Sequence, residues 1–377
     1  MKIAFIDVTT TVSFGGVQTA VWSLAIALTD LGHEVTVFGG QGSIRPDLRG
    51  RAVTIQTFSF TPRERILDLG SRFQRTGERK SFAKHAKAAV TAGGFDWVVL
   101  TKPFDFFWIS LLAKSAPQTR CVFMSGGTDF IAGDRKLAAQ LHACVAVSHF
   151  NAWQVQSRYK RFAQVMYNGV ETSLFQPPAP GDASRATSRA ALGASSLDIL
   201  VMFAGRLVGW KGIEFAIRAL QQPALAALPQ VKLALVGDGA EAAAFRELAQ
   251  RLGVEERVLF LGRKPHTEIA RLYQAADIGL FPSIGDESFG ITIAEAMAAG
   301  LPVVASHVGG IPEVVGNEGT AGMLVPPGDA TAIATAIAAL AGDAARRLAL
   351  GQAARERIER LFTWRQAAQR LLDALPA

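Results

Sequence analysis

A chain of 377 residues is too long for one compact core and is expected to form about two domains. Apolar residues make up 49% of it and charged residues 19%, a balance that excludes an intrinsically disordered protein. The net charge of +7 favours an anionic partner, and no apolar run reaches the roughly 18 residues that a membrane-spanning helix needs.

The N-terminal stretch KIAFIDV is an apolar, β-branched run that predicts a first buried strand, and Asp7 interrupts it, so a signal peptide is not expected. The next segment, GVQTAVWSLAIALTDLG, repeats apolar residues at helical spacing and ends at Gly32. Between strand and helix, Gly15 and Gly16 lack a Cβ atom, so the backbone there can approach a ligand at the helix N-terminus. A plain tight turn explains the glycine pair equally well.

Residues 63–90 carry an excess of Lys and Arg over acids. If the segment is helical, Ile66, Leu69 and Phe73 share a face and the arginines lie elsewhere. Such a segment suits an anionic membrane surface or a phosphorylated acceptor, and a solvated basic surface is the alternative. Nucleic acid is not an expected partner, because no known binding motif accompanies the charge.

Further short apolar runs, EVTVFG, DWVVLTK, RCVFMSG and CVAVS, mostly alternate with helical patterns. This alternation predicts a doubly wound, mostly parallel sheet in a first domain over residues 1–175. Cys121 and Cys144 lie inside two of the runs. We interpret them as buried free thiols of a cytoplasmic protein, and their spacing does not suit a metal site.

Composition changes abruptly in QPPAPGDASRATSRAALGASS, where Pro, Ala, Ser and Gly dominate, so we predict a linker over residues 176–196, with room for a short helix inside it. Alternation then resumes and predicts a second α/β domain over residues 197–355. Residues 356–377 are expected to form a C-terminal helix that can pack back on the first domain. Ligands of such sheets bind outside the carboxyl ends of the strands, so the space between the two domains is the expected site.

The first loop of the second domain, FAGRLVGWKG, places Arg206 and Lys211 directly before a helix. Cations at a helix N-terminus interact unfavourably with the positive end of the helix dipole, and an anion bound between them would make the interaction favourable. The planar fork of an arginine and the point charge of a lysine together suit a diphosphate. Two solvated surface charges are the alternative. Weaker signals follow at two later strand ends, where Gly237 could approach a phosphate or a sugar and Arg263 could lie at a planar base.

The segment GDESFGITIAEA sets two carboxylates among small apolar residues. Glu287 precedes a helix expected over residues 291–299, and Glu295 sits in the middle of that helix with no cation at helical spacing. A buried carboxylate needs partners, and the hydroxyls of a bound ligand would serve because an ionised carboxylate only accepts hydrogen bonds. Backbone amides of residues 289–291 would favour an anionic oxygen at the same place. A buried ion pair with a distant arginine is the alternative.

Five segments, taken in this order, resemble the C-terminal half of retaining glycosyltransferases of family 4: FAGRLVGWKG, LVGDGAE, FLGR, ESFGITIAEAMAAGLPVVAS and VGGIPEVV. FGGVQ, VSHFNA and NGVETSLF resemble the N-terminal markers of that family. The resemblance covers nearly the whole chain. It implies the GT-B fold, an α/β architecture of two facing Rossmann-like doubly wound domains with an interdomain cleft.

The resemblance also implies a role for each matching residue. The expected donor site consists of Arg206 and Lys211 at the diphosphate, Glu295 at the ribose hydroxyls, Glu287 at the hydroxyls of the transferred sugar, the backbone of Phe289, Gly290 and Ile291 at sugar and phosphate, Arg263 at the base, and Gly16 near phosphate and sugar. The residue pattern adds Ser288, Gly237 and Gly15 as further candidate binding residues. No cofactor and no metal ion are expected.

One motif departs from the family pattern. SGGTDF resembles a motif of His-Gly-Thr-Asp type, and Gly126 stands where the family has the histidine. This leaves Asp129 to orient sugar or acceptor. The family's usual mechanism is front-face attack, in which the leaving diphosphate takes the acceptor proton, so Arg206 and Lys211 would stabilise the leaving group.

The function implied is the retaining, metal-independent transfer of a hexose from a UDP- or GDP-sugar to a glycan or lipid-linked glycan acceptor, as in the synthesis of cell-surface polysaccharide or lipopolysaccharide. The expected location is the cytoplasm, with the option of a peripheral position on the inner face of the cell membrane. A nucleotide-sugar epimerase of related fold and a non-catalytic sugar-nucleotide-binding module are the alternatives. An epimerase would convert the donor without an acceptor, and a binding module would show no turnover.

Overall fold

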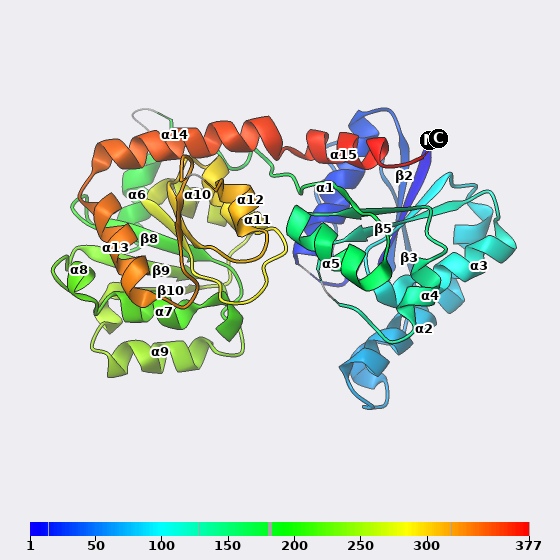
Figure 1. Cartoon of the computed structure of the whole chain (residues 1–377), viewed down its shortest axis with the longest axis horizontal. Helices are drawn as coiled ribbons and strands as arrows, with labels where there is room; N and C mark the ends of the chain where they lie inside the picture. Colours follow the sequence, from blue (N-terminus) through cyan, green and yellow to red (C-terminus); the bar gives the residue numbers. More distant parts are fainter. Residues whose placement is uncertain (14, 128, 180–182, 318, 377) are drawn as a thin grey trace. The chain divides into compact units, whose positions relative to one another are not determined.

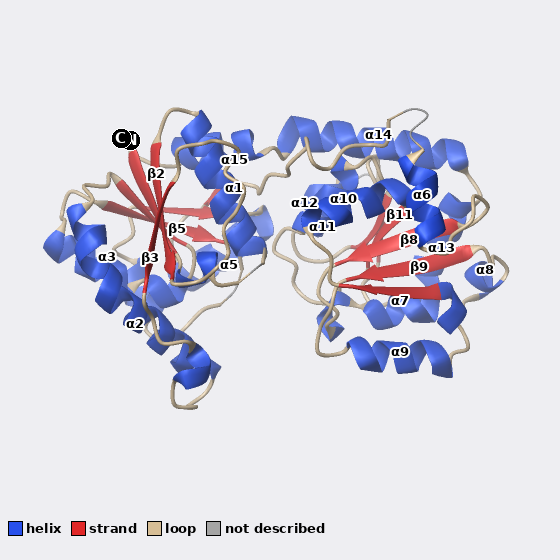
Figure 2. Ribbon diagram, turned by 180° about the vertical axis from the view of Figure 1, so that it is seen from behind, coloured by secondary structure: helices blue, strands red, loops and turns tan. Residues whose placement is uncertain are grey.

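A computed structural model describes residues 1–13, 15–127, 129–179, 183–317 and 319–376. The chain forms two compact units (Figure 1): unit 1 is Met1–Gly169 with Trp364–Ala377, and unit 2 is Val170–Thr363. Each unit contains one parallel sheet with helices on both faces (Figure 2). The predicted α/β class with two doubly wound, Rossmann-like domains is therefore confirmed.

The sheet of unit 1 has the strand order β3-β2-β1-β4-β5-β6-β7. Its strands are β1 (Lys2–Ile6), β2 (Glu34–Gly40), β3 (Thr54–Phe58), β4 (Trp97–Leu100), β5 (Arg120–Ser125), β6 (Ala143–Ala146) and β7 (Gln164–Val165). Its helices are α1 (Gly16–Asp30), α2 (Ser71–Ala92), α3 (Phe107–Ser115), α4 (Asp134–Ala138), α5 (His149–Tyr159) and α15 (Trp364–Asp373), with short 3-10 helices η1 (Val8–Thr11), η2 (Arg63–Arg65) and η3 (Pro103–Asp105).

Strand β1 is buried on both faces. Ile3 and Phe5 belong to one apolar cluster, and Ala4 and Ile6 belong to another on the opposite face of the sheet. A strand covered on both sides needs apolar residues at every position, which is why the sequence there shows no polar alternation. Cys121 and Cys144 are buried free thiols in the same sheet, as predicted.

The sheet of unit 2 has the strand order β10-β9-β8-β11-β12-β13. Its strands are β8 (Ile199–Ala204), β9 (Val231–Val236), β10 (Val258–Gly262), β11 (Ile278–Phe281), β12 (Val303–Ser306) and β13 (Met323–Val325). Its helices are α6 (Ser184–Ala191), α7 (Ile213–Ala219), α8 (Pro223–Ala226), α9 (Ala242–Arg251), α10 (His266–Ala275), α11 (Ile291–Ala298), α12 (Ile311–Val315), α13 (Ala330–Ala341) and α14 (Ala344–Leu361), with 3-10 helices η4 (Gly209–Lys211) and η5 (Glu255–Arg257). Strand β8 lies at the centre of this sheet, flanked by β9 and β11.

The C-terminal residues differ from the single helix predicted over 356–377. Helix α14 ends at Leu361, and the separate helix α15 packs against α1 in the core of unit 1 through four buried residues, Trp364, Ala367, Ala368 and Leu371. The helix breaks because the Phe362 carbonyl accepts a hydrogen bond from the Val170 amide at 2.7 Å, and Thr363 forms a parallel bridge with Val170.

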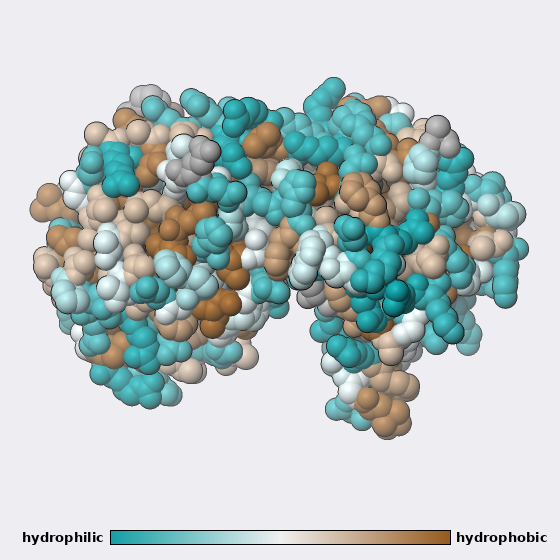
Figure 3. Space-filling view, in the orientation of Figure 1, coloured by the Kyte–Doolittle hydropathy of each residue, from teal (hydrophilic) through white to brown (hydrophobic). Residues whose placement is uncertain are grey.

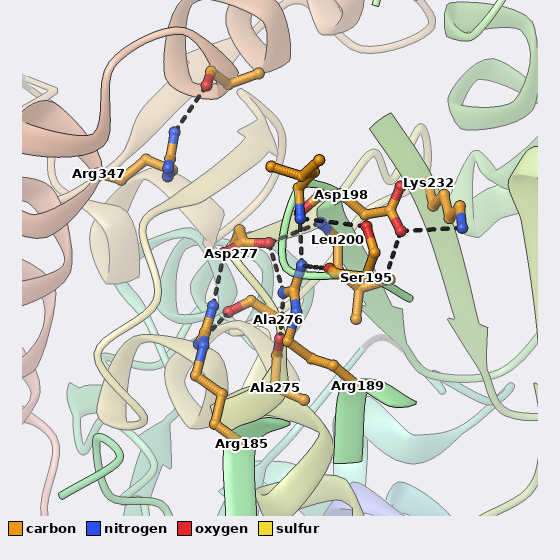
Figure 4. Close-up of polar contacts among 12 residues, drawn as sticks. Arg185, Arg189, Ser195, Asp198, Leu200, Lys232, Ala275, Ala276, Asp277 and Arg347 are labelled. Atoms are coloured by element: carbon orange, nitrogen blue, oxygen red, sulfur yellow. Dashed lines mark hydrogen bonds and ion pairs between the residues drawn. The ribbon is translucent and has the colours of Figure 1, made fainter. Parts of the chain in front are cut away.

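The predicted linker over 176–196 also differs from the structure, because the chain passes from unit 1 to unit 2 at residues 169 and 170. Figure 4 shows why helix α6 belongs to unit 2. Arg185 and Arg189 donate to the two carboxylate oxygens of Asp277 at 2.7 and 2.9 Å, and the same carboxylate accepts the Leu200 amide at 2.8 Å. These bonds fasten α6 to the amino ends of β8 and β11.

Replacement of Asp277 by alanine is expected to destabilise unit 2 by about 3 to 5 kcal/mol, because it leaves the nearly buried Arg189 without its carboxylate. Chemical denaturation followed by circular dichroism measures this loss. The matched control is Glu214→Ala, which removes an exposed pair with Arg218 and is expected to cost at most about 0.5 kcal/mol. Equal losses in the two variants would show that the Asp277 cluster does not fasten α6.

Candidate functional site

The first loop of unit 2 presents two cations at the carboxyl edge of the sheet. Arg206 follows β8 and is exposed, and Lys211 ends the 3-10 helix η4. The guanidinium carbon of Arg206 lies 5.8 Å from the centre of the Trp210 ring, and the ammonium nitrogen of Lys211 lies 4.3 Å from it. Cation–π attraction therefore draws both cations toward one indole. Trp210 is not among the predicted site residues, although an aromatic residue beside Lys211 is visible in the sequence.

A glycine lets this loop lie against the loop that follows β11. Gly212 has φ +70°, and a Cβ atom on it would stand 1.8 Å from the carbonyl oxygen of Pro282. The Trp210 carbonyl accepts hydrogen bonds from the amides of Ile284 and Gly285 at 2.9 and 3.1 Å. These contacts bring the segment that carries Glu287 to the two cations.

Lys211 and Glu287 form an ion pair, so the structure brings these two predicted site residues together. The Lys211 ammonium donates to the Glu287 carboxylate, and the two side chains are 13% and 17% exposed. The Glu287 carbonyl accepts the Gly310 amide at 2.7 Å, which fixes the backbone of this residue. An ammonium has three donors and a carboxylate has several acceptor positions, so the pair keeps capacity for a ligand.

Glu295 is a buried carboxyl group without a cation. It lies in α11, which matches the helix predicted there, and it is 3% exposed. Burial raises its pKa to about 8. Its Oε2 atom has no hydrogen-bond partner, and no basic side chain pairs with it in the part of the chain that the structure describes. The nearby Tyr273 hydroxyl donates instead to the Thr292 carbonyl at 3.0 Å. The alternative of a buried ion pair is therefore wrong for Glu295.

The start of α11 places the loop residues that were predicted to touch sugar and phosphate. Gly290 caps the helix with φ +95°, and Ile291 is the first helical residue. Ser288 precedes them in the same loop. Phe289 is 2% exposed, and its ring lies 5.6 Å from that of Phe362, so its side chain belongs to the core. The predicted ligand contact of Phe289 concerns its backbone, which the burial of the side chain does not test.

Gly237 and Arg263 follow β9 and β10, the two strands on one side of β8. The Gly237 amide donates to the Gly262 carbonyl at 2.9 Å. Gly237 has φ +140°, and a Cβ atom on it would stand 1.8 Å from the Gly205 carbonyl oxygen, so its own neighbours already require a glycine. Arg263 is exposed at the same edge. Both residues therefore share the carboxyl edge with Arg206.

In unit 1, the predicted glycines lie at the N-terminus of α1. Gly15 caps this helix in an extended conformation and Gly16 begins it. A Cβ atom on Gly126 would stand 3.6 Å from the Val17 side chain, an ordinary contact, and Gly126 does not have a positive φ. A side chain could therefore start from position 126. The neighbouring Thr128 of the SGGTDF motif lies outside the described residues.

Asp129 is already paired with two cations. Its carboxylate accepts from Lys102 at 2.7 Å and from Arg75 at 3.4 Å. Partial burial would raise the pKa of this carboxyl group, but Lys102 and Arg75 outweigh that effect and lower the pKa. An ionised carboxylate of low pKa is a poor proton acceptor, so the geometry favours an orienting role over acid–base chemistry. Lys102 is not among the predicted residues.

One arginine of the basic segment 63–90 is buried in unit 1. Arg79 is 5% exposed and pairs with Asp7 at 3.4 Å and Asp105 at 2.5 Å. Burial raises the pKa of Asp105 to about 7, against the effect of Arg79. Arg79 therefore lies outside any basic surface of this segment, because its carboxylate partners are distant in sequence and helical spacing does not reveal them.

Comparison with known proteins covers both units. The family model described as Glycosyltransferase Family 4 matches residues 14–174, and the one described as Glycosyl transferases group 1 matches residues 184–357. The D-inositol 3-phosphate glycosyltransferase of Corynebacterium kroppenstedtii is 35% identical over 216 residues, which are 55% of this chain and 47% of that protein. The protein of the same name from Xylanimonas cellulosilytica is 36% identical over 252 residues, 64% of this chain and 58% of that protein.

The chain spans about half the length of the curated relatives that it matches. Among solved structures, the sucrose-phosphate synthase of Thermosynechococcus elongatus aligns with a TM-score of 0.79 and 25% identity, covering 99% of this chain and 97% of that chain. Within the described residues, no helix combines the length and the hydropathy needed to cross a membrane.

Proposed function

Because the chain belongs to the family 4, group 1 glycosyltransferases with the GT-B fold, we propose that it transfers a hexose from a UDP- or GDP-linked sugar to a glycan or lipid-linked glycan acceptor. The observation that carries this proposal is the buried Glu295, whose Oε2 atom has no partner among the residues that the structure describes. Ribose hydroxyls would donate to it, and the cations Arg206 and Lys211 lie at the same edge of unit 2 to take the diphosphate.

The proposed reaction proceeds with retention and without a metal ion. Arg206 and Lys211 neutralise the charge that develops on the leaving diphosphate, and this diphosphate takes the proton of the attacking hydroxyl. Glu287 accepts from hydroxyls of the transferred sugar while its pair with Lys211 links sugar and diphosphate recognition. Arg263 lies at the base, and Asp129, ionised and held by Lys102, orients the sugar or the acceptor.

A thermal-shift screen of the full chain against UDP, GDP, ADP and their sugars tests the donor site. A ligand that binds the native state raises the melting temperature by mass action. We expect one nucleoside diphosphate to raise the melting temperature of the wild type and to leave that of Glu295→Ala unchanged. Product analysis with the matching nucleotide sugar, in the presence of a chelator, then tests turnover. The absence of any nucleotide shift would contradict the proposed function.

The acceptor is a separate proposal. The curated relatives are named for D-inositol 3-phosphate, a phosphorylated acceptor, and the chain matches about half of their length. Transfer to a glycan or a lipid-linked glycan is proposed on the family resemblance alone. Turnover of the donor without an acceptor to a new nucleotide sugar would favour the epimerase alternative, and binding without turnover would favour a binding module.

We also propose that unit 1 lies on an anionic membrane surface through the loop ahead of α2. Leu67, Leu69 and Phe73 are 71%, 63% and 48% exposed, and the exposed Arg65 and Arg72 stand among them. Figure 3 shows apolar atoms gathered at the tip of unit 1 below the α2 helix of Figure 1. Apolar side chains beside arginines suit the interface of a bilayer with anionic headgroups.

Replacement of Leu67 and Leu69 by serine is expected to reduce flotation with vesicles that contain phosphatidylserine by about tenfold. Full burial of a leucine side chain in the membrane would contribute ~1.5–3 kcal/mol to the binding free energy, and partial burial contributes less. The matched control is Leu348→Ser, which removes a leucine that is also 65% exposed but lies on α14 of unit 2. Flotation that is unchanged, or that falls equally in the control, would remove the membrane proposal.

A further inference from the structure

The end of helix α14 packs against the loop that is proposed to receive the transferred sugar. Phe362 follows α14 and is 1% exposed, and its ring lies edge-on to that of Phe289, with 5.6 Å between the ring centres and an angle of 71° between the planes. Edge-to-face pairs of aromatic rings are favourable at separations of about 4.5–7 Å. Because Phe289 stands between Glu287 and Gly290, its buried ring anchors the backbone on which the sugar contacts depend.

Arg357 supports the same loop from a second point. Its guanidinium carbon lies 5.7 Å from the centre of the Phe362 ring, and its Nε and Nη2 atoms donate to two carbonyls of α12, both at 2.8 Å. The Gly310 amide, just before α12, donates to the Glu287 carbonyl at 2.7 Å. The end of α14 is thus connected to the loop through Phe362 on one side and through α12 on the other.

Arg355 connects α14 to the helix that carries Glu295. Its Nη1 atom donates to the carbonyls of Ala298 at 2.7 Å and Phe175 at 2.6 Å, and both terminal nitrogens lie 3.3 Å from the Thr172 carbonyl oxygen. Ala298 is the last residue of α11, where carbonyls lack partners inside the helix and a cation is favourable. Glu295 precedes it by three residues, so Arg355 holds the end of the helix that presents this carboxyl group.

A close backbone contact makes α14 a firm support for these side chains. A Cβ atom on Gly351 of α14 would stand 2.1 Å from the carbonyl oxygen of Gly300, the residue that follows the end of α11 by two positions. Only a glycine permits this approach. Helix α14 therefore lies directly against the end of α11, and the side chains of Arg355 and Phe362 extend from it to the two elements of the donor site.

We infer that Phe362 and Arg355 are positioning residues of the donor site: Phe362 sets the loop that meets the transferred sugar, and Arg355 sets the helix that presents Glu295 to the ribose. The inference rests on the proposed function, because that function supplies the sugar and the ribose. Both residues act through the backbone that they hold and not by touching the ligand. Loss of Phe362 therefore weakens recognition of the sugar, whereas loss of Arg355 weakens recognition of the nucleoside.

The test for Phe362 compares the affinities of the full chain for the nucleoside diphosphate that raises the melting temperature and for the matching nucleotide sugar, by isothermal titration calorimetry. We expect Phe362→Ala to weaken binding of the nucleotide sugar by about tenfold and that of the nucleoside diphosphate by at most about threefold. The loop supplies the sugar contacts, and the nucleoside diphosphate is held mainly by residues outside it. Phe362→Leu refills most of the space and is expected to recover part of the loss.

The matched control for Phe362 is Leu225→Ala. Leu225 is fully buried on α8 of unit 2, ahead of the amino end of β9, so its truncation disturbs the core and leaves the donor elements in place. We expect both affinities to stay within about twofold of the wild type in this variant.

The test for Arg355 uses the same two ligands and has a different expected pattern. Arg355→Gln is expected to weaken both by about tenfold, because a displaced α11 moves the Glu295 carboxyl group that both ligands use. Lysine at position 355 should recover part of the affinity, since an ammonium can still donate to the carbonyls. The matched control is Arg257→Gln, which removes a guanidinium that donates to four backbone carbonyls elsewhere in unit 2 and is expected to leave both affinities within about twofold.

Equal losses of the two ligands in Phe362→Ala, or a loss in Arg355→Gln no larger than in Arg257→Gln, would overturn the inference. Failure of the wild type to bind any nucleotide would instead overturn the proposed function. Melting temperatures without ligand show which variants are folded. If the alanine or glutamine variant is not, Phe362→Leu or Arg355→Lys takes its place, with the same pattern and a loss of about threefold expected.

Discussion

Replacing Lys211 by methionine is expected to lower kcat for sugar transfer by roughly 10²–10³-fold, the usual cost of removing one preorganised group that stabilises developing charge. The leaving diphosphate becomes more negative as the glycosidic bond breaks, and Lys211 lies beside Glu287, which is proposed to hold the sugar. Methionine keeps the length of the side chain and removes its charge. Initial rates over a range of nucleotide-sugar concentrations separate the loss in kcat from any rise in KM.

The matched control for this experiment is Lys264→Met. Lys264 precedes α10 and forms a partly exposed pair with Glu268, so its removal is expected to leave kcat within a factor of about two. Arginine at position 211 should recover part of the rate because it restores the charge. A kcat for Lys211→Met close to that of the control would show that Lys211 does not stabilise the leaving group.

Affinity for the nucleoside diphosphate is expected to rise with pH up to about 8 and then level off. Burial raises the pKa of Glu295 to about 8, so the ligand-free protein carries a proton there at pH 7. Ribose hydroxyls donate most strongly to the ionised form, so binding releases this proton and becomes easier as the pH approaches 8. Calorimetric titrations in buffers of different ionisation enthalpy measure both the affinity and the proton release.

Glutamine at position 295 removes the titration. We expect Glu295→Gln to bind the nucleotide about 10- to 100-fold more weakly at pH 8, because hydrogen bonds to a charged group contribute roughly 1.5–3 kcal/mol. The nucleotide ionises equally in both experiments, so its contribution cancels when the affinities of the variant and the wild type are compared at each pH. An equal pH dependence of binding in both proteins would exclude Glu295 from the ribose site.

The same pKa also sets the pH dependence of folding stability without ligand. The folded protein holds a proton on Glu295 that the unfolded chain loses above its ordinary pKa near 4.5, so the contribution of this group to stability falls between about pH 4.5 and 8. Glutamine at this position should flatten that part of the profile. Denaturant unfolding at several pH values provides the check that the variant acts through the carboxyl group.

Local sequence predicts much of unit 2 because the signals are short-range. The spacing of apolar residues predicts the helix around Glu295. No cation stands at the neighbouring helical positions, so the sequence also predicts that the Glu295 carboxyl group finds no ion-pair partner within its own helix. The continuous apolar runs predict strands that are buried on both faces, as β1 shows. The resemblance to a known family was needed to predict that Lys211 and Glu287 lie close together. The backbone hydrogen bonds of Trp210 that join their two loops cannot be inferred from the local sequence.

Long-range pairing explains what the local sequence could not predict. Arg79 has helical spacing suited to a surface, yet its carboxylates come from the ends of β1 and η3, which the fold brings together. The segment predicted as a linker is rich in small residues, but Arg185 and Arg189 meet Asp277 from far along the chain.

A crystal structure of the chain with the nucleoside diphosphate that stabilises it is the most direct test of the donor site. We expect the ribose hydroxyls within hydrogen-bonding distance of the Glu295 carboxylate and the diphosphate in contact with Arg206 and Lys211. A nucleotide bound at any other place, with the Oε2 atom of Glu295 still unpartnered, would contradict the account.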